Sequence, residues 1–340
     1  MTSSILAFTL LAGFPSSTAR ASQGEAATDV EAWEGWVDEA LTGRKVEKDY
    51  STMEVADGRV WIAYPKGASK SKLKSGAAKT VAAFDELFDP ASREEGAPAP
   101  RTALLFPLAG RESFAAITTR AAELVPRLGG WAQAAPKGVG FLLDEPLVAG
   151  WLLHVPENEV WSVENELANR LARLLTIERF GRQPHWLAQG LAWQLEIEVC
   201  KDVYCFPYRQ GFVSKKEHRS WPRRLPELME ARGERPLAAA DLFGWPRNSW
   251  DEARAFLAWG AARLLAKHYP EELARILVAY RELREKDGRM TSTDGSWTVI
   301  PDYEIPADEG LAILDRETGV DFLAELERFT RKPKTYRRPR

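Results

Sequence analysis

The sequence predicts an α+β fold, with a small mixed β-sheet and helices in the N-terminal half and a mainly α-helical C-terminal half. Short β-rich runs alternate with helical segments between residues 58 and 155. From Glu159 onward, apolar residues recur almost everywhere at the three-to-four-residue spacing of a packed helix. The 340 residues are 45% hydrophobic and 28% charged, which is typical of a globular protein and excludes a disordered one.

The N-terminus has the pattern of an export signal. An apolar run, Ile5–Phe14, is followed by Pro15 and by a small-x-small motif that ends at Ala21. We therefore expect a signal peptide over residues 1–21 and a secreted or periplasmic protein, although no basic residue precedes the run. The alternative is a frayed apolar N-terminus. The run is too short to span a bilayer, and no later segment is long and apolar enough.

The elements of the first half follow from two kinds of spacing. Tryptophan, valine and leucine side chains in Asp29–Gly43 fall on one side of a helix. Runs rich in β-branched, aromatic and leucine residues, bounded by glycine or proline, predict strands. The predicted strands are Gly58–Pro65, Arg101–Leu108, Lys137–Glu145 and Gly150–Val155, and the further helices are Ala77–Phe88 and Arg111–Val125.

In the second half, Val163–Glu196 predicts two helices joined by a glycine- and proline-containing turn. A capping box from Ser249 to Glu252 predicts the start of a later helix. The remaining predicted elements are helices at Trp250–His268, Pro270–Glu285 and Val320–Phe329, and an extended stretch at Ser296–Pro306. Of thirteen tryptophans, those of this half are expected to pack in the core, or to line a groove for peptide or sugar.

Charge gives little indication of an anionic partner. The formal net charge is −3, so no overall positive field attracts nucleic acid or an anionic membrane, and we predict no nucleic-acid partner. Seven of the last thirteen residues are basic. This basic tail, residues 330–340, is interpreted either as a solvated end or as a contact for an anionic surface.

Cys200 and Cys205 are the only cysteines in the sequence. An exported chain makes a disulfide between them plausible, and we predict that small-loop disulfide. The alternative is a metal or redox pair. Two thiols alone do not complete a zinc site, and a redox pair has the spacing C-x-x-C.

The first predicted helix of the pair has the spacing of a zinc-peptidase helix without its histidines. In H-E-x-x-H, two imidazoles four residues apart share one helix face and bind Zn²⁺, and the glutamate polarises the bound water. Here Asn165, Glu166 and Asn169 occupy that spacing, and Gln189 follows twenty residues after Asn169.

The surrounding residues complete a resemblance. The chain resembles the gluzincin-type (peptidase-MA-like) zinc metallopeptidase domains of bacterial exported proteins, which read H-E-L-x-H and then P-x-W-L-x-E-G-L-A. The likeness extends more loosely from about Val55 to Phe329. The residues that match these two motifs are Glu166, Leu167, Pro184, Trp186, Leu187, Gly190, Leu191 and Ala192.

The resemblance implies a zincin-like domain over residues 55–329. It would follow a helical lead-in at 22–54 and consist of a sheet-containing part at 55–158 and a helical part at 159–329. By this alignment the three zinc ligands of active relatives have become Asn165, Asn169 and Gln189, and only the general base, Glu166, is retained. Neutral amides hold zinc poorly, so we expect no metal, no cofactor and a vestigial Glu166. We also expect the three amides to hydrogen-bond one another.

Three functions remain open at this stage. The first is a catalytically inactive peptidase-like protein whose inherited cleft binds a peptide, a cell-wall fragment or a protein partner. The second is a metal-dependent peptidase or hydrolase with a rearranged site, built from His154, His185 and Glu166. The third is a structural or assembly protein whose cleft is filled by its own side chains.

Overall fold

The protein is described by a computed structural model that covers residues 28–37, 41, 49–90, 100–155, 161–205, 221–247, 249–291, 297–299 and 303–338. The predicted signal peptide and His218 lie outside the described residues.

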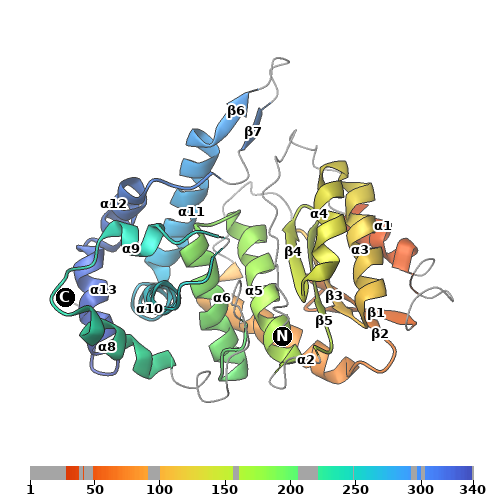
Figure 1. The fold of residues 1–340 in the computed structure, drawn as a ribbon, viewed down its shortest axis with the longest axis horizontal. Coiled ribbons are helices and arrows are strands. Elements are labelled where there is room, and N and C mark those ends of the chain that lie inside the picture. Colours follow the sequence, from red (N-terminus) through yellow and green to blue (C-terminus); the bar gives the residue numbers. More distant parts are fainter. Residues whose placement is uncertain are drawn as a thin grey trace, which may run out of the picture.

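The N-terminal half contains one five-stranded mixed sheet (Figure 1). Its strands, in spatial order, are β1 (Tyr50–Val55), β2 (Val60–Pro65), β3 (Ala103–Leu108), β5 (Leu147–Leu152) and β4 (Gly140–Asp144). The three central strands are parallel, whereas β1 and β4 run antiparallel to their neighbours at the two edges. With the helical second half, this confirms the predicted α+β class.

Helices cover both faces of the sheet, so its three central strands, β2, β3 and β5, are buried on both sides. Successive strand residues point to opposite faces: Leu104 belongs to one hydrophobic core and Leu105 to the other. The first core contains residues of α1 (Thr28–Trp36), α3 (Arg111–Leu124) and α4 (Gly129–Ala134), with the short 3₁₀ helices η3 (Pro126–Leu128) and η4 (Ala135–Lys137) beside them. The second contains α2 (Lys70–Leu87) and the helical half.

The helical half is built around a central hairpin of two helices, α5 and α6 (Figure 1). Its helices are α5 (Val163–Phe180), α6 (His185–Cys200), α8 (Trp221–Arg232), α9 (Ala239–Phe243), α10 (Glu252–His268), α11 (Pro270–Asp287), α12 (Ala307–Thr318) and α13 (Phe322–Arg331). A small hairpin of β6 (Arg289–Thr291) and β7 (Trp297–Val299) extends from α11.

Local chemistry fixes the ends of the α5–α6 hairpin. The Ser162 side chain accepts a hydrogen bond from the backbone N–H of Asn165 and caps the start of α5. Gly181 ends α5 with φ of +68°, a conformation that favours glycine. On α6, a Cβ atom at Gly190 would lie 2.4 Å from the backbone oxygen of Ala258, so glycine permits α6 and α10 to pack closely.

Tryptophans form much of the core around this hairpin. Trp193 is fully buried on α6, and its ring lies 5.1 Å from the ring of Trp221 and 5.9 Å from that of Trp245. Trp221 in turn contacts Trp259 of α10. Since these rings are at most 2% exposed, they serve as core packing and do not line an open groove.

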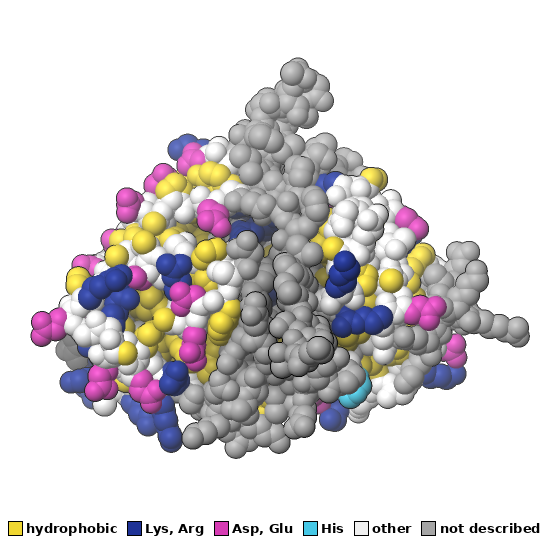
Figure 2. All heavy atoms as spheres, in the orientation of Figure 1, with side chains coloured by type: hydrophobic (Ala, Val, Ile, Leu, Met, Phe, Trp, Pro, Cys, Tyr) yellow, Lys and Arg dark blue, Asp and Glu magenta, His cyan; other side chains and the backbone are white. Residues whose placement is uncertain are grey.

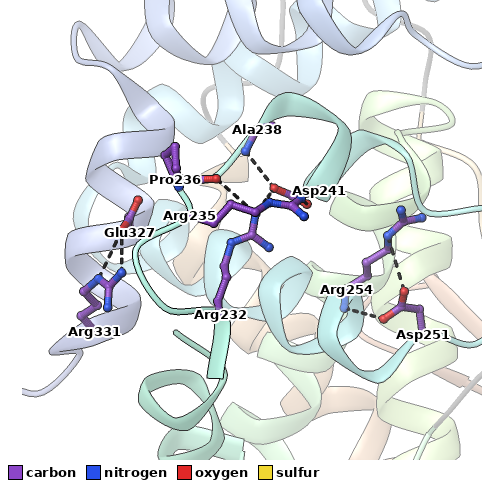
Figure 3. A network of polar contacts seen from close by, with 9 residues as sticks. All are labelled: Arg232, Arg235, Pro236, Ala238, Asp241, Asp251, Arg254, Glu327 and Arg331. Atoms are coloured by element: carbon purple, nitrogen blue, oxygen red, sulfur yellow. Dashed lines mark hydrogen bonds and ion pairs between the residues drawn. The ribbon is translucent and has the colours of Figure 1, made fainter. Parts of the chain in front are cut away.

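Several details differ from the predictions. The cap of α10 is Asp251, whose side chain accepts from the Arg254 N–H, and not Ser249. The sheet begins with β1 at Tyr50, inside the predicted helical lead-in. The helices α8, α9 and α12 were not predicted. Figure 3 shows why α9 begins where it does: Asp241 accepts a hydrogen bond from the backbone N–H of Ala238 and binds two arginines, Arg232 and Arg235.

The described part of the basic tail folds back onto the helical half. The Arg338 guanidinium lies 4.1 Å from the centre of the Tyr269 ring and 2.7 Å from the Glu272 carboxylate. Tyr336 packs edge-on against His268. At these two positions the tail therefore makes specific contacts and does not behave as a fully solvated end.

Neither the described helices nor the charge distribution on the face shown in Figure 2 indicates a membrane contact. No described helix is long and apolar enough to cross a bilayer. Figure 2 shows basic and acidic side chains interspersed over the helical half.

Candidate functional site

Helix α5 places the three motif residues in its first two turns. Asn165, Glu166 and Asn169 are 4%, 6% and 4% exposed. The two asparagines are four residues apart, so they share one side of the helix, and both are directed at α6. The site is therefore a buried contact between two helices, and its polar groups need hydrogen-bond partners.

The hydrogen-bond partner of both asparagines is Glu196, a fully buried residue of α6 that was not predicted as a site residue. The side-chain N–H groups of Asn165 and Asn169 donate to its two oxygens over 2.8 and 3.0 Å. The backbone N–H groups of Tyr204 and Cys205 donate to it over 2.6 and 3.3 Å. Four donors, two from α5 and two from the chain after α6, thus converge on one carboxylate.

Glu166, which the sequence resemblance placed at a general-base position, is also engaged through both its carboxylate oxygens. Arg170, one turn further along α5, donates to one carboxylate oxygen through Nε over 2.8 Å and lies within 2.6 Å through a terminal nitrogen. The Cys205 thiol donates to the other oxygen over 3.3 Å. Arg170 also donates to the backbone oxygen of Phe141 in β4 over 3.1 Å, so the pair connects α5 to the edge of the sheet.

Gln189 does not join this network. Glu196 lies seven positions after it, which is about 10 Å along the helix axis. It is 1% exposed, and its side-chain nitrogen has no hydrogen-bond partner among the described residues. Of the three amides expected to bond one another, two are therefore brought together, but through Glu196, and the third is not bonded to them.

The two cysteines are free thiols, so the disulfide predicted from their spacing is not formed in this structure. Cys205 is buried against Glu166, and burial together with the charges of Glu166 and Glu196 raises the pKa of its thiol well above the usual range. Burial also raises the pKa of Cys200 to about 12. Both thiols stay protonated at neutral pH, which opposes metal binding and nucleophilic chemistry.

The rearranged metal site is not assembled. His185 is the first residue of α6 and lies about 16 Å along the helix axis from Glu196. Glu166 lies at the Glu196 end, because Cys205 contacts both glutamates. His185 is therefore far from Glu166. His154 is exposed just after β5. Among the described residues, no three histidine, cysteine or acidic side chains form a group able to hold a metal.

The chemistry of the α5–α6 contact does not fit zinc. Both asparagines direct N–H groups, not oxygen lone pairs, toward the centre of the contact. The lone pairs of Glu196 accept four N–H donors, and those of Glu166 accept from a guanidinium and a thiol. A divalent cation would have to displace these donors, with only amide oxygens as additional ligands.

Glu196 is also the most perturbed carboxyl at the site. Burial and, to a smaller extent, the nearby charge of Glu166 raise its pKa from 4.5 to about 8. The N–H donors of Tyr204, Asn165 and Asn169 act in the opposite direction, because they stabilise the ionised form.

Sequence reasoning missed Glu196, although a signal exists. Glu196 lies two helical turns after Gln189 on the same face of the predicted helix, between the apolar residues Leu195 and Ile197. An acidic residue at a core position of a buried helix requires a partner.

The chain itself matches no protein-family model and no curated protein.

The first prediction compares two buried amides. Asn169→Leu is expected to lower the free energy of unfolding by about 2–3 kcal/mol, because one oxygen of the buried Glu196 loses its side-chain donor. The matched control, Gln189→Leu, removes an equally buried amide whose nitrogen has no partner among the described residues, and should cost less than about 1 kcal/mol. Urea unfolding of both variants measures the difference. Equal losses would contradict the assigned network.

The second prediction concerns pH. Between pH 4.5 and about 8, the folded protein retains a proton on Glu196 that the unfolded chain has released. The contribution of Glu196 to the free energy of unfolding therefore falls as pH rises through this range, and is fully present only below it.

Glu196→Gln isolates this contribution, since it removes the titration. The lowered pKa values of His185 and His268 change the stability in the opposite direction, because these histidines bind their protons at a higher pH in the unfolded chain than in the folded protein. This effect is the same in the wild type and in Glu196→Gln. The stability of the wild type relative to Glu196→Gln should decrease steadily across the range. A constant difference would show that Glu196 has an ordinary pKa.

Proposed function

We propose that the protein is an exported, catalytically inactive relative of gluzincin-type metallopeptidases, and that it binds a peptide, a cell-wall fragment or a protein partner without cutting it. The observation that carries the proposal is the shared carboxylate: both former histidine positions donate N–H groups to Glu196. Export rests on the N-terminal sequence alone, with its apolar run and Ala21.

The state of Glu166 supports the absence of catalysis. A general base needs an accessible lone pair near a polarised water, and a metal that lowers the pKa of that water from about 15.7 toward about 7. Glu166 is buried, and its oxygens are engaged by Arg170 and Cys205. Its contacts give it a structural role that joins α5 to β4.

The sheet edge supports a binding role. β4 is the last strand of the sheet, and its far side has no partner strand in the described structure. Such an edge can pair with an extended chain, whose backbone groups then complete the ladder. Arg170 of α5 contacts this strand at Phe141, so the edge lies directly beside the former catalytic helix.

Metal analysis of the wild-type protein tests the absence of a metallopeptidase activity. Protein purified without chelator should contain well below one zinc per chain and should leave unstructured peptides intact after zinc is added. Stoichiometric zinc, or hydrolysis that Glu166→Gln abolishes, would contradict the proposal.

A reverse substitution tests the inferred ancestry. Asn165→His combined with Asn169→His places two imidazoles beside the Glu196 carboxylate, which gives a two-histidine, one-glutamate ligand set with Glu196 in the role that the resemblance assigned to Gln189. This double variant should bind one zinc. Adding Glu196→Gln should abolish that binding, whereas adding Gln189→Glu should not be required. A double variant that folds but does not bind zinc would count against the proposed relationship to gluzincin-type metallopeptidases.

A further inference from the structure

The chain after α13 is attached to folded structure at both of its ends. This tail segment, Lys332–Arg338, runs from the end of α13 to the junction of α10 and α11. The Arg338 guanidinium lies over the Tyr269 ring and donates a hydrogen bond to the backbone oxygen of His268 over 3.0 Å. Tyr336 packs edge-on against His268, with 4.7 Å between the ring centres. The tail segment therefore follows one path over the surface.

Three basic side chains of the tail segment point to no partner. Lys332, Lys334 and Arg337 are exposed, and none of them forms an ion pair or a side-chain hydrogen bond within the part of the chain that the structure describes. The first and the last are five positions apart, which spans at most about 18 Å even in a fully extended chain. The segment thus presents a short row of positive charges.

Nearby acidic side chains offset this row only in part, because most of them are engaged or buried. Glu327 of α13 binds Arg331 over 2.8 Å, and Glu272 of α11 binds the last arginine of the tail segment over 2.7 Å. Glu325 has no exposed surface. Glu271 is exposed, but it lines a groove on the side of α11 that faces α2.

The end of α10, where the tail segment is attached, adds further positive charge. Burial and, to a smaller extent, the charges of three nearby cations lower the pKa of His268; these cations are Lys267, Arg263 and Arg338. Lys267 is exposed, and Glu198 offsets it only across 3.9 Å. Cations of α10 and of the tail segment therefore act on the same place, which favours a negatively charged partner.

The side chains around the row indicate what kind of anion fits. Leu124, on α3, is the large hydrophobic side chain that is exposed among the described residues, so the tail segment has no apolar anchor to insert into a bilayer. The ring of Tyr336 packs against Phe329 as well as His268 and is not free to stack on a base. A lysine binds phosphate as a point charge, without a fixed geometry. A flexible chain of phosphate groups satisfies these conditions.

We propose that the tail segment is a docking site for a flexible linear polymer of phosphate groups, bound through Lys332, Lys334 and Arg337. Because the segment is already held against α10, binding does not have to order it, and that part of the entropy cost is avoided. The site is independent of the proposed function, since it shares no residue with the α5–α6 network or the β4 edge.

Fluorescence anisotropy of labelled linear polyphosphate, titrated with the full-length protein, tests the site. Wild-type protein should bind the polymer, and its affinity should fall by about tenfold or more between about 50 and 200 mM salt, since binding releases counterions. The triple variant Lys332→Gln, Lys334→Gln, Arg337→Gln should bind at least about tenfold more weakly at low salt, because the contacts that release counterions are lost.

The matched control removes the same net charge elsewhere. Lys70, Lys74 and Lys79 are exposed lysines of α2 without an ion pair among the described residues. The triple variant Lys70→Gln, Lys74→Gln, Lys79→Gln should keep the wild-type affinity. Thermal unfolding of both variants checks that they fold.

A measurement on the wild type alone does not depend on any variant. Polyphosphate should protect Lys332 and Lys334 from chemical acetylation, and should leave Lys70 and Lys74 reactive. Absence of polyphosphate binding, equal losses in the two triple variants, or equal protection of all four lysines would overturn the proposal.

Two further probes distinguish other anionic partners. Single-stranded DNA of the same total charge should bind no more tightly than polyphosphate, and vesicles of phosphatidylglycerol and phosphatidylcholine should bind more weakly. Tighter binding of the DNA would identify a nucleic-acid site, and tighter binding of the vesicles a membrane site. Either result would overturn the proposed partner.

Discussion

A single buried carboxylate organises the centre of this protein. Glu196 has no exposed surface, and such a group remains compatible with folding only when donors replace its lost water. Two asparagines of α5 and two backbone N–H groups beyond α6 supply those donors. The register of the α5–α6 hairpin and the path of the chain after α6 are thereby fixed by one hydrogen-bonded group.

The same network accounts for the chemical character of the site. Where the zinc-peptidase motif that the sequence resembles presents imidazoles to a cation, this chain presents amide N–H groups to a buried carboxyl group, so hydrogen-bond donors stand where metal ligands were expected. Arg170 supplies a fixed positive charge to Glu166 and reaches the β4 backbone. The arrangement stabilises helix packing and leaves no group poised to activate water. A function by binding, and not by hydrolysis, follows as our proposal.

Much of the architecture was predictable because its causes are local. Apolar residues at helical spacing and the turn that contains Gly181 predict α5 and α6, and the four-residue spacing of Asn165 and Asn169 places them on one face. Glu196 was not predicted as their partner, because the residue opposite them depends on the length of α5 and its turn. β1 was missed because its sequence, YSTMEV, has little apolar alternation. The start of α10 was predicted two residues too early, because both Ser249 and Asp251 are residue types that cap helices, and the structure uses Asp251.

The most direct test of the account is a double-mutant cycle between Asn165→Leu and Glu196→Met, measured by the free energy of unfolding. The two side chains are 2.8 Å apart, and at pH 9, above the raised pKa of Glu196, a hydrogen bond to the ionised carboxylate should give a coupling energy of about 1.5–3 kcal/mol. The double variant should then lose less than the sum of the single losses. Strict additivity would show that the carboxylate and the amide do not depend on each other, and that another contact holds the helices together.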